Sequence, residues 1–354
     1  MRLMIAASGT GGHLFPAIAL AEQLPDYQIE WLGVPNRLET QLVPAQYPLH
    51  TIAVEGFQER LGLGTLRVLG KLTSSILQVR QLLKQGKFQG VFTTGGYIAA
   101  PAVIAARSLS LPVILHEANA IPGKVTRYFS PWCSAVALGF EPAAQYLTRV
   151  RTIYTGTPVR SQFRIGGIDQ LPPLDLPIPE DVPVIVVVGG SQGAVAVNQL
   201  VRQCAEAWFD AGAVIVHLTG TNDPDAASLK HRQYFPLPFY DNMAGLLLRA
   251  NLAISRAGAG TLTELAACGT PSILIPFPYA AEDHQTYNAA VFGAAGAALV
   301  FRQAELTPQV LETKVLSLLQ SPEQLDVMGK SARAIAVPDS AERLATIVRQ
   351  LLET

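Results

Sequence analysis

The sequence is poor in cysteine and in charged residues, and each shortage excludes a class of protein. Only three of the 354 residues are cysteines, namely Cys133, Cys204 and Cys268, and they are far apart among apolar neighbours. This number and spacing exclude a disulfide framework and a cysteine-based metal site, and they predict buried free thiols in a reducing compartment. Charged residues make up 15% of the chain and apolar residues 49%, a balance typical of a well-buried globular α/β protein.

Long uninterrupted apolar runs are also lacking. Residues 4–21 and 90–106 contain no Asp, Glu, Lys or Arg, but glycines and a proline interrupt both. Neither segment is a convincing membrane span, and a strand that starts directly after Met1 leaves no place for the apolar region of a signal peptide. We therefore expect a cytoplasmic protein whose membrane contact, if any, is peripheral.

Apolar strands alternate with helical patterns in both halves of the chain, which predicts a doubly wound parallel sheet in each. Strands are expected at 2–7, 28–33, 49–53, 90–93, 111–115, 134–137 and 152–154, with helices at 14–24, 38–44, 65–86, 99–109 and 122–129. The second half has expected strands at 184–188, 213–218, 234–238, 252–254 and 272–275, with helices at 193–207, 242–249, 260–268, 284–293 and 307–319.

A proline-rich stretch between Gly156 and Pro183 separates the two halves. It indicates a boundary near Arg160, with one domain at 1–160 and another at 161–338. A last helix within 339–354 could pack back on the first domain, although the sequence does not decide this.

Each half opens with a strand that enters a glycine-rich turn and then a helix. Strand 2–7 precedes Ser8-Gly9-Thr10-Gly11-Gly12-His13, and strand 184–188 precedes Gly189-Gly190-Ser191-Gln192-Gly193. Such a turn lets backbone N–H groups approach an anion at the positive end of the helix dipole. Leu14 breaks the dinucleotide fingerprint in the first turn. Close packing alone could explain one turn, but two favour a phosphorylated ligand held between two domains.

The net charge of −1 hides a contrast between the halves. Residues 1–160 carry 14 Lys and Arg against 8 Asp and Glu, a balance of +6, whereas residues 161–354 carry 12 against 19, a balance of −7. Complementary domain surfaces would explain this contrast. Alternatively, the first half faces an anionic lipid surface or a phosphorylated substrate. No nucleic-acid partner is expected.

A basic stretch, residues 61–88, contains no Asp or Glu and would place Arg67, Lys71, Arg80 and Lys84 beside apolar side chains. Cations next to apolar groups bind anionic lipid headgroups through both charge and burial. An amphipathic helix with its apolar side in the core accounts for some of the leucines. We therefore expect only the basic side, with a few exposed apolar neighbours, to touch a membrane.

The segment 255–264 follows an expected strand and ends in Ala259-Gly260-Thr261-Leu262-Thr263-Glu264. Its small residues would admit a diphosphate, and Glu264 could bind ribose hydroxyls through both carboxylate oxygens. A capping box from Thr261 to Glu264 explains the same spacing without a ligand. The local sequence leaves both explanations open.

Taken in order, these motifs resemble the MurG family, the UDP-N-acetylglucosamine:undecaprenyl-diphospho-muramoylpentapeptide N-acetylglucosaminyltransferases of bacterial peptidoglycan synthesis. The matching motifs are G-T-G-G-H-x-x-P at 9–16, G-G-Y at 95–97, H-E-x-N at 116–119, T-P-V-R at 157–160, G-G-S-Q-G at 189–193, the segment that ends at Glu264, and D-H-Q-x-x-N at 283–288. The resemblance covers nearly the whole chain.

The resemblance implies a GT-B fold, in which two Rossmann-like doubly wound domains face a central cleft. The N-terminal domain would bind the lipid-linked acceptor and the membrane, and the C-terminal domain the UDP-sugar. The implied donor-binding residues are Thr10, Gly11, Gly12, Asn119 beside the sugar, Arg160 and Ser191 at the diphosphate, Tyr240 at the uracil, the segment Ala259 to Thr263, Glu264 at the ribose and Gln285 at the sugar hydroxyls.

The chain departs from the family pattern at four positions. Ser8 stands where glycine is common, Ala118 replaces a glutamine, and Ala257 stands where serine is frequent. Tyr240 is bulkier than the isoleucine of some relatives, so we expect the uracil contact to be made by the backbone.

The implied reaction is inverting transfer of N-acetylglucosamine from UDP-N-acetylglucosamine to the muramoyl 4-hydroxyl of the undecaprenyl-linked acceptor, at the cytoplasmic face of the bacterial plasma membrane. The glycine turns, Ser191 and Arg160 would stabilise the departing diphosphate without a cofactor or an obligatory metal. His13, at the start of a helix, is the candidate general base, and Glu117 is the second candidate. Alternatively, His13 only orders the turn.

Other functions fit the same architecture. A UDP-N-acetylglucosamine 2-epimerase would need several convergent acid–base groups and no lipid-facing surface. Another GT-B glycolipid glycosyltransferase, or a noncatalytic sugar-nucleotide sensor, would also bind the donor. UDP release with and without a lipid acceptor separates transfer, epimerisation and sensing.

Overall fold

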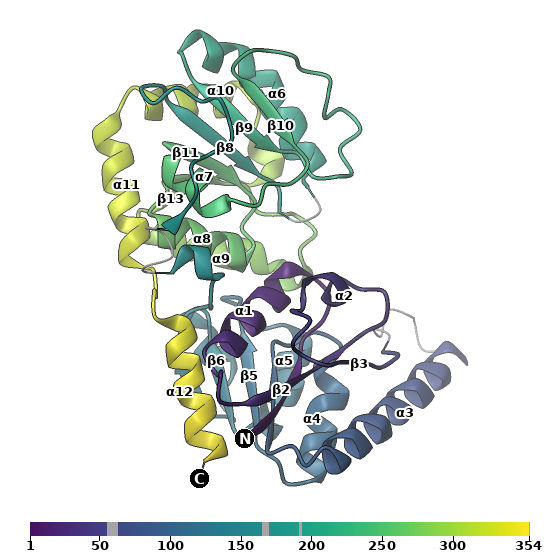
Figure 1. Cartoon of the computed structure of the whole chain (residues 1–354). Helices are drawn as coiled ribbons and strands as arrows, with labels where there is room; N and C mark the ends of the chain where they lie inside the picture. Colours follow the sequence, from purple (N-terminus) through teal and green to yellow (C-terminus); the bar gives the residue numbers. More distant parts are fainter. Residues whose placement is uncertain (55–62, 165–169, 191–192, 354) are drawn as a thin grey trace. The chain divides into compact units, whose positions relative to one another are not determined.

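The computed structural model describes residues 1–54, 63–164, 170–190 and 193–353, and Figure 1 traces the chain. The chain forms two compact units. One unit comprises Met1–Arg160 together with Asp339–Thr354, and the other comprises Ser161–Pro338. Among the helices of the described residues, none is long and apolar enough to cross a bilayer.

The first unit is built on a seven-stranded sheet in the order β3-β2-β1-β4-β5-β6-β7, in which every pairing is parallel. Its strands are β1 (Arg2–Ala6), β2 (Gln28–Gly33), β3 (Leu49–Thr51), β4 (Gly90–Thr93), β5 (Val113–Glu117), β6 (Ala135–Leu138) and β7 (Thr152–Tyr154). All residues of β4, β5 and β6 are buried, as expected for strands covered on both faces.

Helices cover both faces of this sheet. They are α1 (Gly11–Glu22), α2 (Glu39–Leu42), α3 (Leu63–Gln85), α4 (Ala99–Ser108), α5 (Lys124–Phe129) and α12 (Ser340–Leu352), with short 3-10 helices η1 (Ser130–Trp132) and η2 (Glu141–Tyr146). Leu3 and Ile5 of β1 share a core with α1 and α12, whereas Met4 and Ala6 share another with α3 and α4. The alternation of side chains along β1 thus divides the core into two layers.

The last helix, α12, packs on α1, which answers a question that the sequence left open. Leu344 and Val348 are buried in the core that also contains residues of α1. At the end of the helix, Arg349 pairs with Asp26, 2.5 Å away, and Tyr27 donates a hydrogen bond to Glu353. These contacts hold α12 against the rest of the first unit.

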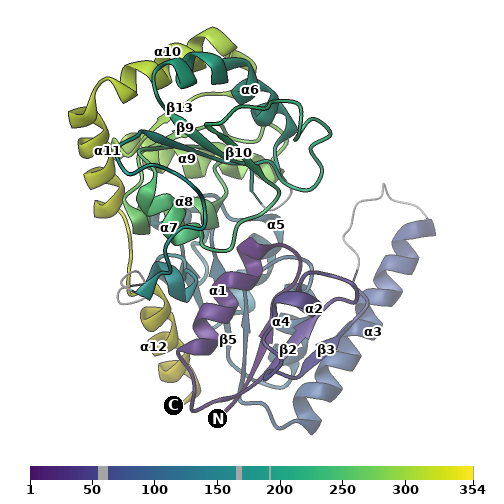
Figure 2. The ribbon, with the colours of Figure 1, turned by 45° about the horizontal axis from the view of Figure 1, so that its top comes forward.

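The second unit contains a six-stranded parallel sheet in the order β10-β9-β8-β11-β12-β13. Its strands are β8 (Val184–Val188), β9 (Val214–Leu218), β10 (Tyr234–Leu237), β11 (Leu252–Ser255), β12 (Ser272–Leu274) and β13 (Ala298–Val300). The helices are η3 (Ser161–Phe163), α6 (Val195–Asp210), α7 (Met243–Arg249), α8 (Ala259–Cys268), η5 (Ala281–Asp283), α9 (His284–Ala294), η6 (Gln303–Glu305), α10 (Pro308–Leu319) and α11 (Pro322–Ala334). Helices α6 and α10 pack side by side over the core (Figure 2).

Several elements differ from the sequence-based expectations. Strand β13 and helix α11 were not predicted, and strand β5 lies two residues later than expected. The shift of β5 places His116 and Glu117 inside the strand as its last two residues. All three cysteines are free; Cys204 and Cys268 are buried as expected, and Cys133 is partly buried. Burial raises the pKa of each thiol to about 12.

Candidate active site

The two glycine turns follow the first strand of each sheet, β1 and β8. In open parallel sheets, ligands bind beyond the carboxyl ends of the strands, which is where these turns lie. Gly9 has a φ of 105° and Gly193 a φ of 76°, values that favour glycine. A Cβ at Gly193 would lie 2.4 Å from the carbonyl oxygen of Thr219, so no side chain fits there. Ser191 and Gln192 lie outside the described residues.

The carboxylate of Glu39 supports the first turn. It accepts hydrogen bonds from the hydroxyl of Ser8 at 2.5 Å, from the backbone N–H of Gly9 at 3.2 Å and from the backbone N–H of Val34 at 2.7 Å. Glu39 is fully buried. Ser8, one of the departures from the family pattern, therefore gains a hydrogen bond that glycine could not make.

His13 is the third residue of α1, which begins at Gly11, three residues earlier than expected. Its Nδ1 lies 2.7 Å from the carbonyl oxygen of Thr94. A carbonyl only accepts hydrogen bonds, so Nδ1 carries the proton and Nε2 of the neutral ring carries the lone pair. A Cβ at Gly96 would lie 3.9 Å from Nε2, so the ring lies beside the G-G-Y turn after β4.

Arg160 lies near the start of the same helix. Its guanidinium carbon is 4.8 Å from the centroid of the Phe15 ring. The Phe15 ring also lies against Gly11, where a Cβ would be 2.8 Å from Cε2 of the ring. The first glycine turn and Arg160 are therefore joined through Phe15. Thr10 and Gly12 are exposed beside them, while Gly11 is buried.

His116 is buried at the end of β5, with Nε2 3.2 Å from the carbonyl oxygen of Gly156. Its Nδ1 has no hydrogen-bond partner among the residues that the structure describes. Burial lowers the pKa of His116 to about 4, although the hydrogen bond to the carbonyl of Gly156 acts in the opposite direction. His116 is therefore neutral at physiological pH.

Glu117 holds the loop that follows β5. One carboxylate oxygen accepts from both the backbone N–H and the side-chain amide of Asn119 at 3.0 Å, and the other accepts from the backbone N–H of Gly123 at 3.2 Å. Both carboxylate oxygens of Glu117 are therefore engaged in hydrogen bonds. This geometry favours a role in positioning Asn119 and disfavours a role as proton acceptor.

In the second unit, the side-chain oxygen of Gln285 accepts two backbone N–H groups. These belong to Ala257 at 3.1 Å and to Phe277 at 2.9 Å. The oxygen of the amide is thereby fixed, and its NH₂ group remains as a pair of donors. Asn288 donates to the carbonyl of Ala257 at 3.2 Å, so α9 is tied to the end of β11.

Arg256 braces the same region, and sequence reasoning missed it. The buried guanidinium donates to the carbonyl oxygens of Ile275 at 3.0 Å and Pro276 at 3.2 Å, and to Gln303 at 2.7 Å. It also lies 5.4 Å from the centroid of the Phe277 ring. Burial lowers the pKa of Arg256 to about 10, so the side chain remains charged at neutral pH.

Of the two explanations left open for Glu264, the structure excludes the capping box from Thr261 to Glu264. Helix α8 begins at Ala259 after the N-cap residue Gly258, so Thr261 is the third residue of the helix and Glu264 the sixth. Thr263 donates its hydroxyl to the carbonyl of Ala259 at 2.8 Å. Leu262 is buried, whereas Gly260 and Glu264 are partly exposed. Glu264 therefore lies too far into α8 to take part in its N-terminal cap.

Tyr240 follows β10, and its hydroxyl donates to the carboxylate of Asp175 at 2.5 Å. Burial raises the pKa of Tyr240 to about 12, and the neighbouring Asp175 adds to this effect. The hydroxyl of Tyr240 is therefore already engaged with a residue of the same unit.

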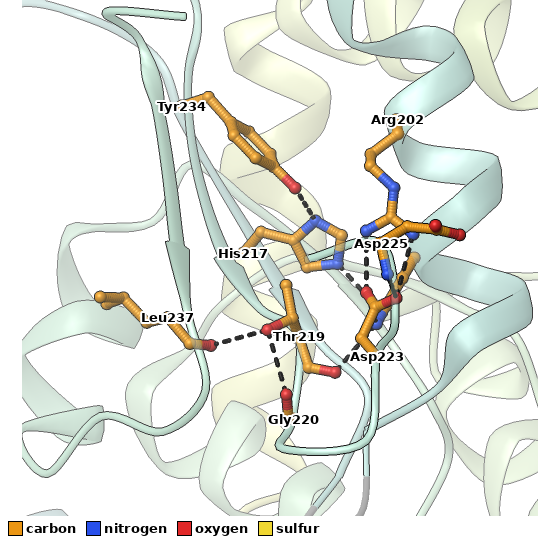
Figure 3. A network of polar contacts seen from close by, with 9 residues as sticks. Arg202, His217, Thr219, Gly220, Asp223, Asp225, Tyr234 and Leu237 are labelled. Atoms are coloured by element: carbon orange, nitrogen blue, oxygen red, sulfur yellow. Dashed lines mark hydrogen bonds and ion pairs between the residues drawn. The ribbon is translucent and has the colours of Figure 1, made fainter. Parts of the chain in front are cut away.

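A buried polar network joins α6 to β9 and to the loop that follows β9 (Figure 3). Nε2 of His217 donates to the side-chain oxygen of Asn198 at 3.0 Å, and Nδ1 accepts from the hydroxyl of Tyr234 at 2.9 Å. Asn198 donates to Asp223 at 2.7 Å, and Arg202 pairs with Asp223 at 2.8 Å. Burial lowers the pKa of His217 to about 3, and the charge of Arg202 assists.

This network matters because it fixes the loop after β9. Asn198 also donates to the carbonyl oxygen of Thr219 at 2.9 Å, the atom that approaches Gly193 of the second glycine turn. The loop after β9 is thus held against α6. Its members are spread from 198 to 234, so no local motif revealed them.

Most of the basic stretch lies in α3. The side chains of Lys71, Arg80 and Lys84 are described, and that of Arg67 lies outside the described residues. Val79 and Leu83 are buried, whereas Leu77 is 61% exposed. Arg80 donates to the hydroxyl of Ser108 in α4 at 3.0 Å. The apolar side of the helix is therefore in the core, and one leucine stands beside the exposed cations.

Comparison with known proteins defines the class. Residues 3–138 match the glycosyltransferase family 28 N-terminal domain, and residues 184–344 match the glycosyltransferase family 28 C-terminal domain. With two Rossmann-like parallel sheets, the protein has the GT-B fold of these glycosyltransferases.

Individual relatives narrow this class. The UDP-N-acetylglucosamine--N-acetylmuramyl-(pentapeptide) pyrophosphoryl-undecaprenol N-acetylglucosamine transferase of Nostoc punctiforme is 71% identical, covering 100% of this chain and 99% of the relative. The enzyme of the same name from Nostoc sp. strain PCC 7120 is 72% identical, and the match covers 100% of this chain and 98% of the relative. The crystal structure of Acinetobacter baumannii MurG is 30% identical, with a TM-score of 0.79 over 99% of both chains. The chain therefore belongs to the MurG family.

Proposed function

We propose that the protein transfers N-acetylglucosamine from UDP-N-acetylglucosamine to the muramoyl 4-hydroxyl of undecaprenyl-diphospho-muramoylpentapeptide (lipid I). The products are lipid II and UDP, and the step belongs to peptidoglycan synthesis. Similarity over the full length to the Nostoc punctiforme transferase supports this proposal. The observation that carries the chemistry is the hydrogen bond from His13 to Thr94, which leaves the lone pair on Nε2.

In the proposed reaction, the acceptor 4-hydroxyl oxygen attacks C1 of the donor sugar from the side opposite the diphosphate. The C1–oxygen bond to the diphosphate breaks as the new glycosidic bond forms, so the configuration at C1 inverts. The hydroxyl proton passes to Nε2 of His13. Departing UDP gains negative charge, which Arg160, Ser191 and the backbone N–H groups of the glycine turns would stabilise.

The donor contacts that we propose fall in both units. In the second unit, Glu264 binds the ribose hydroxyls, the backbone at Tyr240 contacts the uracil, and the segment Ala259 to Thr263 lies along the diphosphate. The NH₂ group of Gln285 donates to the sugar hydroxyls, which fits the fixed orientation of that amide. In the first unit, Thr10, Gly11, Gly12 and Asn119 are the proposed contacts.

We further propose that the first unit binds the acceptor and associates peripherally with the cytoplasmic face of the plasma membrane. Leu77, Arg80 and Lys84 stand at i, i+3 and i+7 on α3, so they share one face of the helix. The exposed leucine and its two cations suit an anionic lipid surface. Lys71 and Arg67 extend the same basic stretch.

UDP release measured in the presence and in the absence of the lipid acceptor tests this function. We expect rapid release only when both substrates are present. Conversion of the donor to its 2-epimer without acceptor would indicate an epimerase instead, and donor binding without turnover would indicate a sensor.

A further inference from the structure

A hollow of about 470 Å³ opens beside the first glycine turn, on the side of the loop between β2 and α2. Its size lies within the range of small-ligand sites. The residues that line it are Gly9, Asn36, Arg37, Leu38, Thr40 and Gln41. None of the proposed donor contacts is among them.

The walls of this hollow are held in place by the buried carboxylate of Glu39. It accepts hydrogen bonds from the hydroxyl of Ser8 and from the backbone N–H of Gly9, which lines the hollow, and also from the backbone N–H of Val34, two residues before the lining residue Asn36. The hydroxyl of Thr40 donates to the carbonyl of Arg37 at 2.7 Å, which orders the loop itself. The hollow is therefore a built feature of the first unit.

Arg37 supplies the charge of the hollow. Its side chain is exposed, and no carboxylate of the residues that the structure describes pairs with it. Glu39, two positions away, already accepts three hydrogen bonds. An exposed guanidinium without a carboxylate partner can bind a carboxylate or phosphate of a ligand through two parallel hydrogen bonds.

The other side chains of the hollow distinguish these two anions. Asn36 and Gln41 carry carboxamides, each of which donates and accepts hydrogen bonds, as the amide groups of a peptide do. A pyrophosphate offers acceptors only and would leave the carboxamide oxygens unmatched. Leu38, 36% exposed, adds apolar surface for an aliphatic side chain. The combination favours a peptide with a free carboxylate.

We infer that this hollow binds the peptide stem of the acceptor, with Arg37 on a peptide carboxylate. The inference rests on the proposed function, which assigns the acceptor to the first unit. Gly9 and His13 are four residues apart, so they lie within about 14 Å of each other. In a muramoyl group, the peptide is attached through the oxygen next to the attacking 4-hydroxyl. A peptide in the hollow and a 4-hydroxyl near His13 are therefore compatible.

The test compares Arg37→Ala with the wild type on two acceptors. One acceptor carries the pentapeptide, and the other has no peptide and a lactyl carboxyl capped as an amide. We expect Arg37→Ala to raise the KM for the pentapeptide acceptor about tenfold, and to leave kcat and the KM for UDP-N-acetylglucosamine unchanged. With the capped acceptor, the variant and the wild type should behave alike. Arg151→Ala, which removes another exposed arginine of the first unit, is the matched control.

Two outcomes would overturn the inference. Equal losses with both acceptors would place Arg37 on the pyrophosphate or the sugar, and an unchanged KM with both would remove the hollow from acceptor binding. If the wild type transfers to neither acceptor, the proposed function fails. Binding of soluble N-acetylmuramoyl-pentapeptide, followed by NMR line broadening, then still tests the hollow, because it must weaken in Arg37→Ala and persist in Arg151→Ala.

Discussion

The Nδ1 atom of His13 lies 2.7 Å from the carbonyl oxygen of Thr94, a contact between the start of α1 and the end of β4. The contact sets the tautomer of the ring, because a carbonyl cannot donate a hydrogen bond. It also fixes the direction of the second nitrogen, Nε2, beside the turn of Gly95 and Gly96. A general base needs such a fixed lone pair.

His13→Ala should lower kcat by about 100-fold or more, the usual contribution of a general base. The affinity for UDP should change little, because the proton transfer occurs only in the transition state. Steady-state kinetics and equilibrium UDP binding measure the two effects separately. Near-normal turnover in this variant would exclude His13 as the base and would direct attention to Glu117.

Glu264→Ala should weaken UDP binding by about tenfold, because two hydrogen bonds from ribose hydroxyls to a carboxylate are lost. A ribose contact is made equally before and in the transition state, so kcat should remain close to normal. Calorimetric titration with UDP measures the affinity. Glu323→Ala, on the exposed side of α11, serves as the control. UDP affinity that stays unchanged in folded Glu264→Ala would rule out the ribose contact.

Arg256→Lys keeps a positive charge but cannot reproduce the fork of hydrogen bonds to Ile275, Pro276 and Gln303. We expect the KM for UDP-N-acetylglucosamine to rise several-fold while UDP affinity is retained. Arg256 binds the carbonyls of Ile275 and Pro276, next to Phe277, whose backbone N–H binds the proposed sugar contact Gln285. In a double-mutant cycle with Gln285→Ala, the two losses should therefore be strongly non-additive. Additive losses would show that Arg256 does not act through Gln285.

Stability should depend on pH through His217. Its pKa is about 3 in the folded protein and 6.5 for an unperturbed histidine, so between these values the unfolded chain binds a proton that the folded protein does not. The contribution of neutral His217 is therefore complete above pH 6.5 and is lost as the pH falls toward 3, at about 1.4 kcal/mol per pH unit. His217→Gln should be less stable at pH 7.5 and should lose less stability between pH 7 and 5. Urea unfolding at several pH values measures this, and parallel curves would contradict it.

Replacing Lys71, Arg80 and Lys84 together by Glu should reduce sedimentation with anionic liposomes and slow transfer to a bilayer-embedded acceptor. UDP binding should remain intact, because α3 packs on α4 and contributes none of the proposed donor contacts. Lys230, Lys314 and Lys330, exposed in the second unit, provide a control triple variant with the same change of charge. Unchanged liposome binding in the α3 variant would refute this placement of the membrane face.

Much of the fold could be predicted from the sequence because the strands are buried apolar runs between glycine turns. Strand β8 and strand β4 have the predicted limits. Helix α11 was missed because its buried face, Leu325, Met328, Gly329 and Ala332, contains only two large apolar side chains. Strand β13 was missed because it has three residues, of which one is buried.

The supporting residues of the site could not be predicted because they act over long sequence separations. Glu39 binds Ser8 across 31 residues, and Arg256 binds Gln303 across 47. The sequence could not decide for or against the capping box for a related reason. A Thr and a Glu three residues apart can stand anywhere in a helix. The cap is identified only by where α8 begins, which is after Gly258.

The most direct test of the account is the structure of the product. The protein is incubated with UDP-N-acetylglucosamine and the undecaprenyl-linked acceptor, and the isolated lipid is analysed by mass spectrometry and NMR. The account predicts one added N-acetylglucosamine, joined to the muramoyl 4-oxygen with the configuration at C1 inverted from that of the donor. A sugar attached with retained configuration, or at another oxygen, or an unchanged acceptor beside an epimerised donor, would contradict it.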